Sequence, residues 1–284
     1  MAAPAIIHVT IFAVYPILRG AGFSLFRMNL MQPWLHRFVG LRNYTDALSD
    51  PAIRHSLAVT LMFTASCVAM ELALGLCLAL LLWTDNRFNR VATILMLVPI
   101  TVTPIVVGLI FRALLDPSFG LIGYWLTWAH LAPPQGLLGD THTALMTMMA
   151  VDVWEWAPLA ALILLAGLKS LPADSLDAAA IDGAGPVAKL GRIILPMMLP
   201  SIFLVLVLRV TDVFRTYDIV FAATGGGPGD STNLLMLDAV KQGLQFFDIG
   251  YGSAISILMT LAIAILAGVI ILALRGLDRR YNTL

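Results

Sequence analysis

Charged side chains interrupt the apolar stretches of this chain at a few points, and these residues are the ones best placed to do chemistry. In one stretch the charges alternate in sign at intervals of three residues: Arg209, Asp212, Arg215 and Asp218. Residues three apart on a helix are neighbours, so each charge can pair with the next and form a ladder of ion pairs. Because three-residue steps drift around a helix, the four do not share one face. We expect some of them to face a water-filled cavity or another subunit.

A second apolar stretch carries Asp152 and Glu155 within the run VDVWEWAP. A helix rises ~1.5 Å per residue, which puts Glu155 and Arg209 both ~20 Å from the ends of their helices, and we predict that they lie close together across a shared cavity. Carboxylates, an arginine and indole rings suit a sugar, which forms hydrogen bonds through its hydroxyls and stacks on aromatic rings. A structural ion-pair network is an equally good interpretation. The candidate residues of a substrate pathway are Asp152, Trp154, Glu155, Arg209, Asp212, Arg215 and Asp218.

No other group of residues suggests catalysis or metal binding. The carboxylates of Asp152 and Glu155 have no activated nucleophile beside them, and the five histidines are scattered along the chain. Cys67 and Cys77 lie in one apolar stretch, where they cannot reach each other along a helix. The run TGGGPG at 224–229 lacks the Lys-Ser/Thr of a phosphate-binding loop and is interpreted as a turn. We expect no catalytic, cofactor-binding or metal site within the chain.

The elements that position these charges are membrane-spanning helices. Of the 284 residues, 60% are hydrophobic and 12% are charged, and the mean hydropathy is +0.90, which is the composition of a polytopic membrane protein. A formal net charge of zero argues against nucleic acid as a partner. Since a span takes ~20 apolar residues, the sequence predicts an all-α protein that forms a single transmembrane domain over residues 1–284. Its six predicted spans are 5–26, 56–83, 91–115, 143–168, 197–221 and 253–274.

The distribution of Lys and Arg predicts which ends of the spans are cytoplasmic. With the N-terminus inside, three segments on that side carry basic residues: Arg87 and Arg90, then Lys169, Lys189 and Arg192, then Arg275, Arg279 and Arg280. Both termini are therefore expected in the cytoplasm, and segment 169–196 is predicted to be a cytoplasmic loop. One exception is the predicted external loop 27–55, which also contains basic residues: Arg27, Arg37, Arg42 and Arg54.

The predicted cytoplasmic loop contains the most distinctive motif, DAAAIDGAGPVAKLGRIILP at 177–196. Its first six residues favour a helix, Gly183 and the following Gly-Pro pair turn the chain, and a helix resumes at Val187. The alanines present a smooth, low-entropy surface that fits a groove on another protein, with Asp177 and Asp182 as flanking charges. The pattern predicts a docking helix at the membrane surface. Its candidate contact residues are Asp177, Ala178, Ala179, Asp182, Gly183, Ala184, Ile193, Leu195 and Pro196.

This motif resembles the cytoplasmic coupling loop of permease subunits of binding-protein-dependent ABC importers, in which Glu-Ala-Ala, Asp-Gly-Ala and Ile-x-Leu-Pro recur at this spacing. Here Asp177 stands in place of the glutamate. The resemblance extends over nearly the whole chain. The segment GLRNYTDALSDP at 40–51 resembles the external segment that follows the first helix in sugar-type permeases. The end of the fifth predicted span, with Tyr217-Asp218, and the run TGGGP that follows it resemble the fifth-helix signature of permeases for maltose, trehalose and glycerol phosphate.

The resemblance implies the type I permease fold of ABC importers, with six transmembrane helices, in a bacterial cytoplasmic (inner) membrane. It implies a subunit that translocates a carbohydrate, such as the disaccharides trehalose or maltose, and that is not an enzyme by itself. The implied partners are a second related permease, two cytoplasmic ATPase subunits that bind ATP and Mg, and an external solute-binding protein. Two alternatives stay open: an ion-coupled secondary carrier that uses the buried charges, and an ABC permease for a non-sugar solute.

Overall fold

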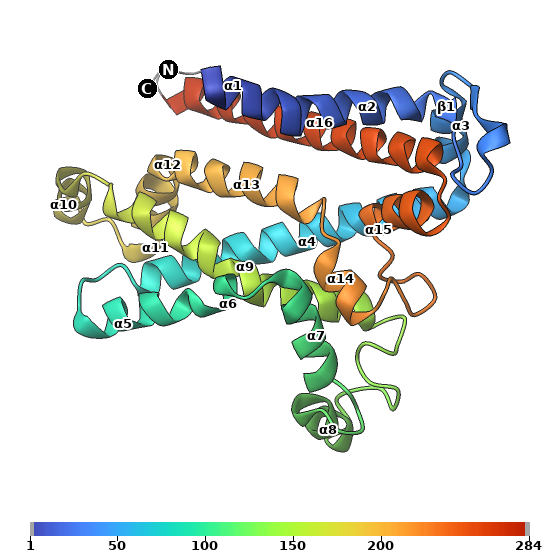
Figure 1. Ribbon diagram of the computed structural model, residues 1–284. Coiled ribbons are helices and arrows are strands. Elements are labelled where there is room, and N and C mark those ends of the chain that lie inside the picture. Colours follow the sequence, from blue (N-terminus) through green and yellow to red (C-terminus); the bar gives the residue numbers. More distant parts are fainter. Residues whose placement is uncertain (1–2, 282–284) are drawn as a thin grey trace.

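The protein folds almost entirely into helices (Figure 1). The computed structural model describes residues 3–281, and the strands in that range are β1 (Phe26–Arg27) and β2 (Arg37–Phe38), which pair as an antiparallel hairpin. Four helical segments are long and apolar enough to cross a membrane without a sharp bend. They are the first span (Ala3–Ser24), α4 (Pro51–Leu81), α9 (Ala144–Lys169) and most of α16 (Ile249–Tyr281). The predicted all-α membrane architecture is confirmed.

The other two predicted spans are bent, and each resumes with a proline in the first turn of its second part. The third span consists of α5 (Arg87–Met96), α6 (Val98–Thr101) and α7 (Pro104–Leu114), and the chain turns by 93° between α6 and α7. In the fifth span it turns by 65° before α13, through α11 (Pro186–Lys189), η3 (Leu190–Ile194), α12 (Leu195–Met197) and α13 (Leu199–Val213). Proline starts a helix readily but cannot continue one, because it lacks the N–H and clashes with the preceding turn.

The C-terminal part of the fifth span differs from the predicted single helix over 197–221. α13 ends at Val213, and a separate short helix, α14, runs from Asp218 to Ala223. The N–H groups of Arg215 and Thr216 bond to carbonyls three residues back, which tightens and closes the last turn of α13. The prediction of one continuous helix is therefore wrong: Arg209 and Asp212 lie on α13, Arg215 lies in the turn after it, and Asp218 begins α14.

The centre of the protein is the contact between α4 and α9, which lie side by side (Figure 1). Small residues allow the close approach: a Cβ atom at Gly75 of α4 would lie 2.9 Å from the Cβ of Ala160 on α9. Around this contact, apolar side chains of α4, α9, α13 and α14 are buried together, among them Phe63, Cys67, Met148, Val213 and Ile219. This packing sets the positions of the helices that carry the charged residues.

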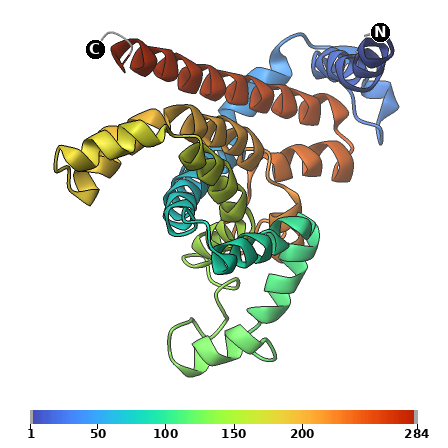
Figure 2. The same ribbon diagram turned by 90° about the vertical axis from the view of Figure 1, so that its left-hand side faces the viewer.

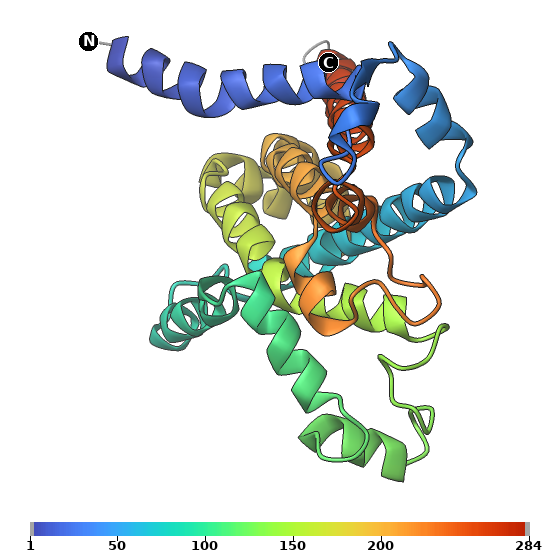
Figure 3. The same cartoon turned by 45° about the vertical axis from the view of Figure 1, so that its right-hand side comes forward.

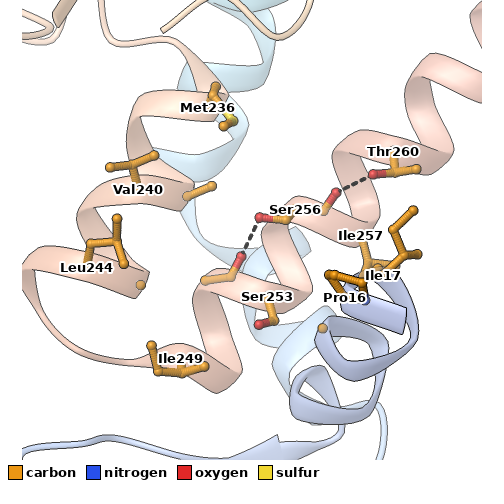
Figure 4. A pocket seen from close by; sticks show the side chains of 14 residues that line it. Pro16, Ile17, Met236, Val240, Leu244, Ile249, Ser253, Ser256, Ile257 and Thr260 are labelled. Atoms are coloured by element: carbon orange, nitrogen blue, oxygen red, sulfur yellow. Dashed lines mark hydrogen bonds between the residues drawn. The ribbon is translucent and has the colours of Figure 1, made fainter. Parts of the chain in front are cut away.

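The first span lies at the edge of the fold. It consists of α1 (Ala3–Val9), η1 (Thr10–Val14) and α2 (Tyr15–Ser24), and only its last part packs against α16 while α1 extends away (Figure 3). An apolar cavity of about 460 Å³ remains between α2, α15 (Leu235–Val240) and α16 (Figure 4). The hydroxyls of Ser256 and Thr260 beside it donate to carbonyls of α16 itself. Most of the first span is thus left for lipid or a partner protein to cover.

Short elements occupy the ends and one side of the bundle. Near the hairpin lie η2 (Pro33–Leu35), α3 (Arg42–Ser49) and η4 (Lys241–Gln245), and α8 (Leu121–Trp128) follows α7. At the opposite end, α10 (Ala173–Ile181) and α11 protrude from the helical body (Figure 2).

We expect Gly75→Ala to destabilise the protein by about 1–3 kcal/mol, because the added methyl group overpacks the contact between α4 and α9. Gly268→Ala is the matched control, since a Cβ atom at this helical glycine meets nothing within 4 Å. Thermal unfolding of the purified protein measures both changes. Equal melting temperatures for the two variants would contradict the close packing.

Candidate functional site

Arg209 of α13 lies at the centre of a buried cluster of charges. The residue is only 2% exposed, and it donates two parallel hydrogen bonds to Glu71 of α4, from Nε to Oε2 at 2.6 Å and from Nη2 to Oε1 at 2.7 Å. Nη2 also donates to Oδ2 of Asp152 on α9 at 3.2 Å. A bidentate arginine–carboxylate pair fixes geometry as well as charge. One side chain thereby joins three membrane spans.

Two further groups complete the surroundings of this guanidinium. Nη1 donates to Oδ2 of Asp212 at 2.8 Å, and the guanidinium carbon lies over the ring of Trp156 at 4.6 Å from its centroid. The indole face attracts the cation and covers the side of the guanidinium that makes no hydrogen bonds. Arg209 is therefore held from several directions at once.

Glu71 is absent from the site residues predicted from the sequence, although one signal marks it. It stands alone as a carboxylate in the apolar part of α4. A lone charge inside a span is costly unless another helix supplies a partner. The residue type and its setting thus indicated an ion pair between helices, but only the packing of α13 against α4 identifies the partner.

The predicted ladder of charges forms only in part. Arg209 pairs with Asp212, and Asp212 approaches Arg215 at 3.7 Å. Among the ion pairs of the described residues there is none between Arg215 and Asp218, because the chain leaves the helix between them. The ladder therefore runs from the buried cluster to the exposed end of α13, where the Asp212 and Arg215 side chains are 48% and 58% exposed.

Glu155 and Trp154 occupy surroundings different from those of Arg209. Glu155 is 1% exposed, and neither of its carboxylate oxygens has a hydrogen-bond partner within the described part of the chain. The ion pairs of Arg209 are with Glu71, Asp152 and Asp212. The predicted proximity of Glu155 and Arg209 across a shared cavity stays a prediction. Trp154 is 47% exposed, contacts Phe111 edge to face at 5.1 Å, and lines an apolar groove. Adjacent residues on a helix point in different directions, which separates these two.

Exposed polar and aromatic groups gather where α13 gives way to α14. The rings of Tyr217 and Phe221 stack with centroids 5.1 Å apart and an interplanar angle of 14°. Asp212, Arg215 and Asp218 are exposed beside them. We call these five residues the α13–α14 patch. It combines carboxylates, a guanidinium and a phenol with an aromatic surface, which are groups that bind a polyhydroxylated molecule through hydrogen bonds and ring stacking.

The Gly-rich run after α14 forms a turn, as predicted. Gly225 and Gly226 have positive φ angles of 63° and 97°, which glycine adopts without strain. Thr232 closes the turn with a hydrogen bond from its hydroxyl to the Gly227 carbonyl at 2.7 Å. The amide of Asn233 then donates to the Ser56 hydroxyl of α4 at 3.0 Å. The turn is thus fixed to the start of the second span.

The predicted docking loop has the expected helix–turn–helix form. α10 ends at Ile181, Gly183 turns the chain with a φ of +75°, and a helix resumes at Pro186. Ile181 and Val187 are both exposed beside the turn, as are Asp177, Ala178 and Asp182. Ile193, Leu195 and Pro196 are half-buried where the chain re-enters the bundle. The side chains of Ala179, Arg275, Arg279 and Arg280 lie outside the described residues.

Residues 71–283 match the family described as binding-protein-dependent transport system inner membrane components. The chain belongs to this family. The matched range begins at Glu71 and contains the buried cluster, the α13–α14 patch and the loop 169–196. The permease is therefore a multi-pass membrane protein whose charged cluster and protruding loop both lie within the family's shared region.

Similar proteins extend the match toward the N-terminus. The permease is 35% identical to the trehalose/maltose transport system permease protein of Thermococcus litoralis, over 91% of this chain and 86% of that protein. It is 34% identical to the trehalose transport system permease protein of Mycobacterium tuberculosis, over 95% and 86%. It is 30% identical to the sn-glycerol-3-phosphate transport system permease protein of Pectobacterium atrosepticum, over 98% and 93%. These relatives match over nearly the whole chain and differ in the solutes that they are named for.

A solved structure confirms the predicted fold. A chain of a bacterial alginate ABC transporter, solved in complex with a periplasmic protein that holds an alginate pentasaccharide, superposes with a TM-score of 0.80. The match covers 99% of the permease and 93% of that chain at 19% sequence identity. The permease has the fold of ABC importer permeases, and its described residues contain four candidate spans, or six if each bent pair of helices is one span.

We expect Arg209→Gln to lower the stability of the permease by about 3–5 kcal/mol, because it leaves the buried carboxylates of Glu71 and Asp152 without their cation. Adding Glu71→Gln to the same chain should recover part of the loss, which a double-mutant cycle of unfolding free energies measures. Arg215→Gln is the control, with an exposed ion pair worth about 0–1 kcal/mol. Equal losses for Arg209→Gln and Arg215→Gln would exclude the buried cluster as the link between the spans.

Proposed function

We propose that this permease is the membrane subunit of an ATP-driven importer that moves a carbohydrate, in the size range of trehalose or maltose, into the cytoplasm. The observation that carries the proposal is the α13–α14 patch, where stacked aromatic rings lie beside exposed charged groups. Sugars are recognised by this combination of ring stacking and hydrogen bonds. The names of two relatives, permeases for trehalose/maltose and for trehalose, support this class of solute, while a third is named for the polyol phosphate sn-glycerol 3-phosphate.

The residues of the proposed substrate pathway divide into two groups. Asp212, Arg215 and Asp218 are exposed and would contact the sugar directly, together with Tyr217. The buried residues Asp152, Glu155 and Arg209 would act from behind, because their side chains are closed off from solvent in this chain. The hydrogen bond from Arg209 to Asp212 connects the two groups. Trp154 faces a separate apolar groove, where it would contact lipid or the second permease.

The proposed mechanism couples the protruding loop to this pathway. Segment 169–196 would be cytoplasmic, with α10 docked in a groove of an ATPase subunit, and segment 27–55 would be external. When ATP closes a pair of ATPase subunits, α10 would move with its groove, and α9 and the fifth span would transmit the motion to the buried cluster. The solute would then be exposed first to the outside and afterwards to the cytoplasm.

The proposed partners follow from this mechanism. A second related permease would complete the pathway, since one chain leaves the α13–α14 patch and the first span uncovered. Two ATPase subunits would bind ATP and Mg, so the permease itself would have no catalytic role. An external solute-binding protein would deliver the sugar. Both termini would lie on the cytoplasmic side of a bacterial inner membrane, according to the distribution of lysine and arginine.

We expect Tyr217→Ala to raise the sugar concentration for half-maximal uptake about fivefold, from the loss of roughly 1 kcal/mol of stacking. Uptake is measured in proteoliposomes that contain the whole complex and its binding protein. Tyr124→Ala is the matched control, because Tyr124 is an exposed tyrosine on α8, outside the patch. If both variants behave like the wild type, the patch does not contact the solute.

We expect Gly183→Val to lower ATPase activity stimulated by the binding protein by roughly fivefold or more, because valine at a positive φ introduces strain of about 1–3 kcal/mol and displaces α10. Gly191→Val is the control: this glycine has equally open surroundings but no positive φ.

Uptake and ATPase assays on the same preparation distinguish the proposed sugar importer from the two alternative functions. ATP-driven uptake without stimulation by any sugar would indicate a non-sugar solute, and uptake that follows an ion gradient without a co-purified ATPase would indicate a secondary carrier.

A further inference from the structure

The β1–β2 hairpin lies at the level where two membrane spans end. It follows α2, which ends at Ser24, and it is bonded to the residues around the start of α16 (Figure 1). The N–H of Leu30 donates to the Phe247 carbonyl at 2.9 Å, and the N–H of Gly250 donates to the Met28 carbonyl at 3.2 Å. Because both helices are apolar spans, their adjacent ends mark the boundary between hydrocarbon and headgroups.

The tip of this hairpin is apolar and exposed. Trp34 is 78% exposed, and Leu30, Met31, Phe246 and Phe247 are exposed on the same segment or on the residues bonded to it. A cluster of large apolar side chains is unusual on a surface that faces only water. At the boundary of a bilayer it is expected, since tryptophan places its apolar ring among the lipids and its N–H near the headgroups.

Two arginines of the hairpin stand directly opposite each other. Arg27 and Arg37 are cross-strand partners, so their Cβ atoms lie about 5 Å apart, and like charges at such positions repel. Both side chains are exposed. Within residues 3–281, the ion pairs closer than 4.0 Å include neither of them. Among the described residues, neither arginine therefore has a direct ion-pair partner.

The carboxylates around this hairpin already have partners. Three of them line a cavity of about 230 Å³ together with the first of the two arginines. Asp46 pairs with Arg42 at 3.7 Å, and Asp50 and Asp248 accept hydrogen bonds from the hydroxyl and the N–H of Tyr251. Hydrogen bonds from neutral groups leave the negative charges of Asp50 and Asp248 in place, so these carboxylates offset the charge of Arg27 in part. Arg37 is not among the residues that line this cavity.

We propose that the β1–β2 hairpin binds anionic phospholipid at the membrane surface, with Arg27 and Arg37 holding a headgroup phosphate while Trp34 inserts beside it. The forked guanidinium matches the geometry of phosphate oxygens. This interaction also explains why segment 27–55 contains arginines, although external loops usually contain few of them. The hairpin is a lipid-binding element that fixes the ends of the first and sixth spans at the bilayer surface.

A second permease subunit is the rival occupant of the same surface. A protein interface over the hairpin would have to bury two adjacent guanidinium groups, and removing charges from water is costly without a full set of partners. Headgroup phosphates supply the opposite charge while leaving the site hydrated. The charge and the depth of the hairpin therefore favour lipid.

The test titrates phosphatidylglycerol with brominated acyl chains into the purified complex in neutral detergent and follows tryptophan fluorescence. The signal of Trp34 is the difference between the wild type and Trp34→Phe. We expect phosphatidylglycerol to quench Trp34, and each of Arg27→Gln and Arg37→Gln to raise the half-quenching concentration about fivefold. Arg42→Gln is the matched control, because this arginine of the same segment already pairs with Asp46.

Three results would overturn the proposal: no quenching of Trp34 in the complex, equal quenching by brominated phosphatidylcholine, or identical titrations for the Arg27, Arg37 and Arg42 variants. Absence of quenching together with crosslinking of position 34 to the second permease would assign the surface to protein instead. The double variant Arg27→Lys with Arg37→Lys is the control for misfolding. It keeps both charges and should therefore retain most of the lipid affinity. ATPase activity of each preparation verifies assembly.

Discussion

A guanidinium buried among packed helices is stable only where carboxylates and hydrogen bonds replace the water that it loses. Arg209 meets this condition by joining Glu71 of α4 to Asp152 of α9, and the indole of Trp156 covers its face. The positions of the three helices are mutually dependent as a result. A shift of α13 against α4 would separate opposite charges at low dielectric, so the three spans are expected to move as one unit.

The bends in the third and fifth spans determine which side chains this rigid unit exposes. α13 begins at Leu199 with Pro200 in its first turn and ends at Val213, so its charges lead from the buried cluster to an exposed end. Tyr217 and Phe221, four residues apart at the start of α14, stack on each other. The short turn between α13 and α14 separates Asp218 from the charges of α13.

Two elements at the edges of the fold leave apolar side chains uncovered. The first span and the protruding α10 make few contacts with the rest of the chain, and both carry exposed apolar side chains. Such surfaces are stable only when lipid or protein covers them. The arrangement fits a permease that works as one part of a larger membrane assembly.

Composition and local pattern were enough to determine the all-α membrane class, the approximate positions of the six spans and the helix–turn–helix loop around Gly183, because these depend on hydropathy and on backbone preferences of neighbouring residues. The pairing of charges was decided by the tertiary structure. Glu71 and Arg209 are 138 positions apart, and no local rule relates them. The same holds for the different surroundings of Trp154 and Glu155, which lie next to each other in the sequence. Which helix faces which is set by side-chain packing across the bundle, and that packing decides which charges are buried and which remain exposed.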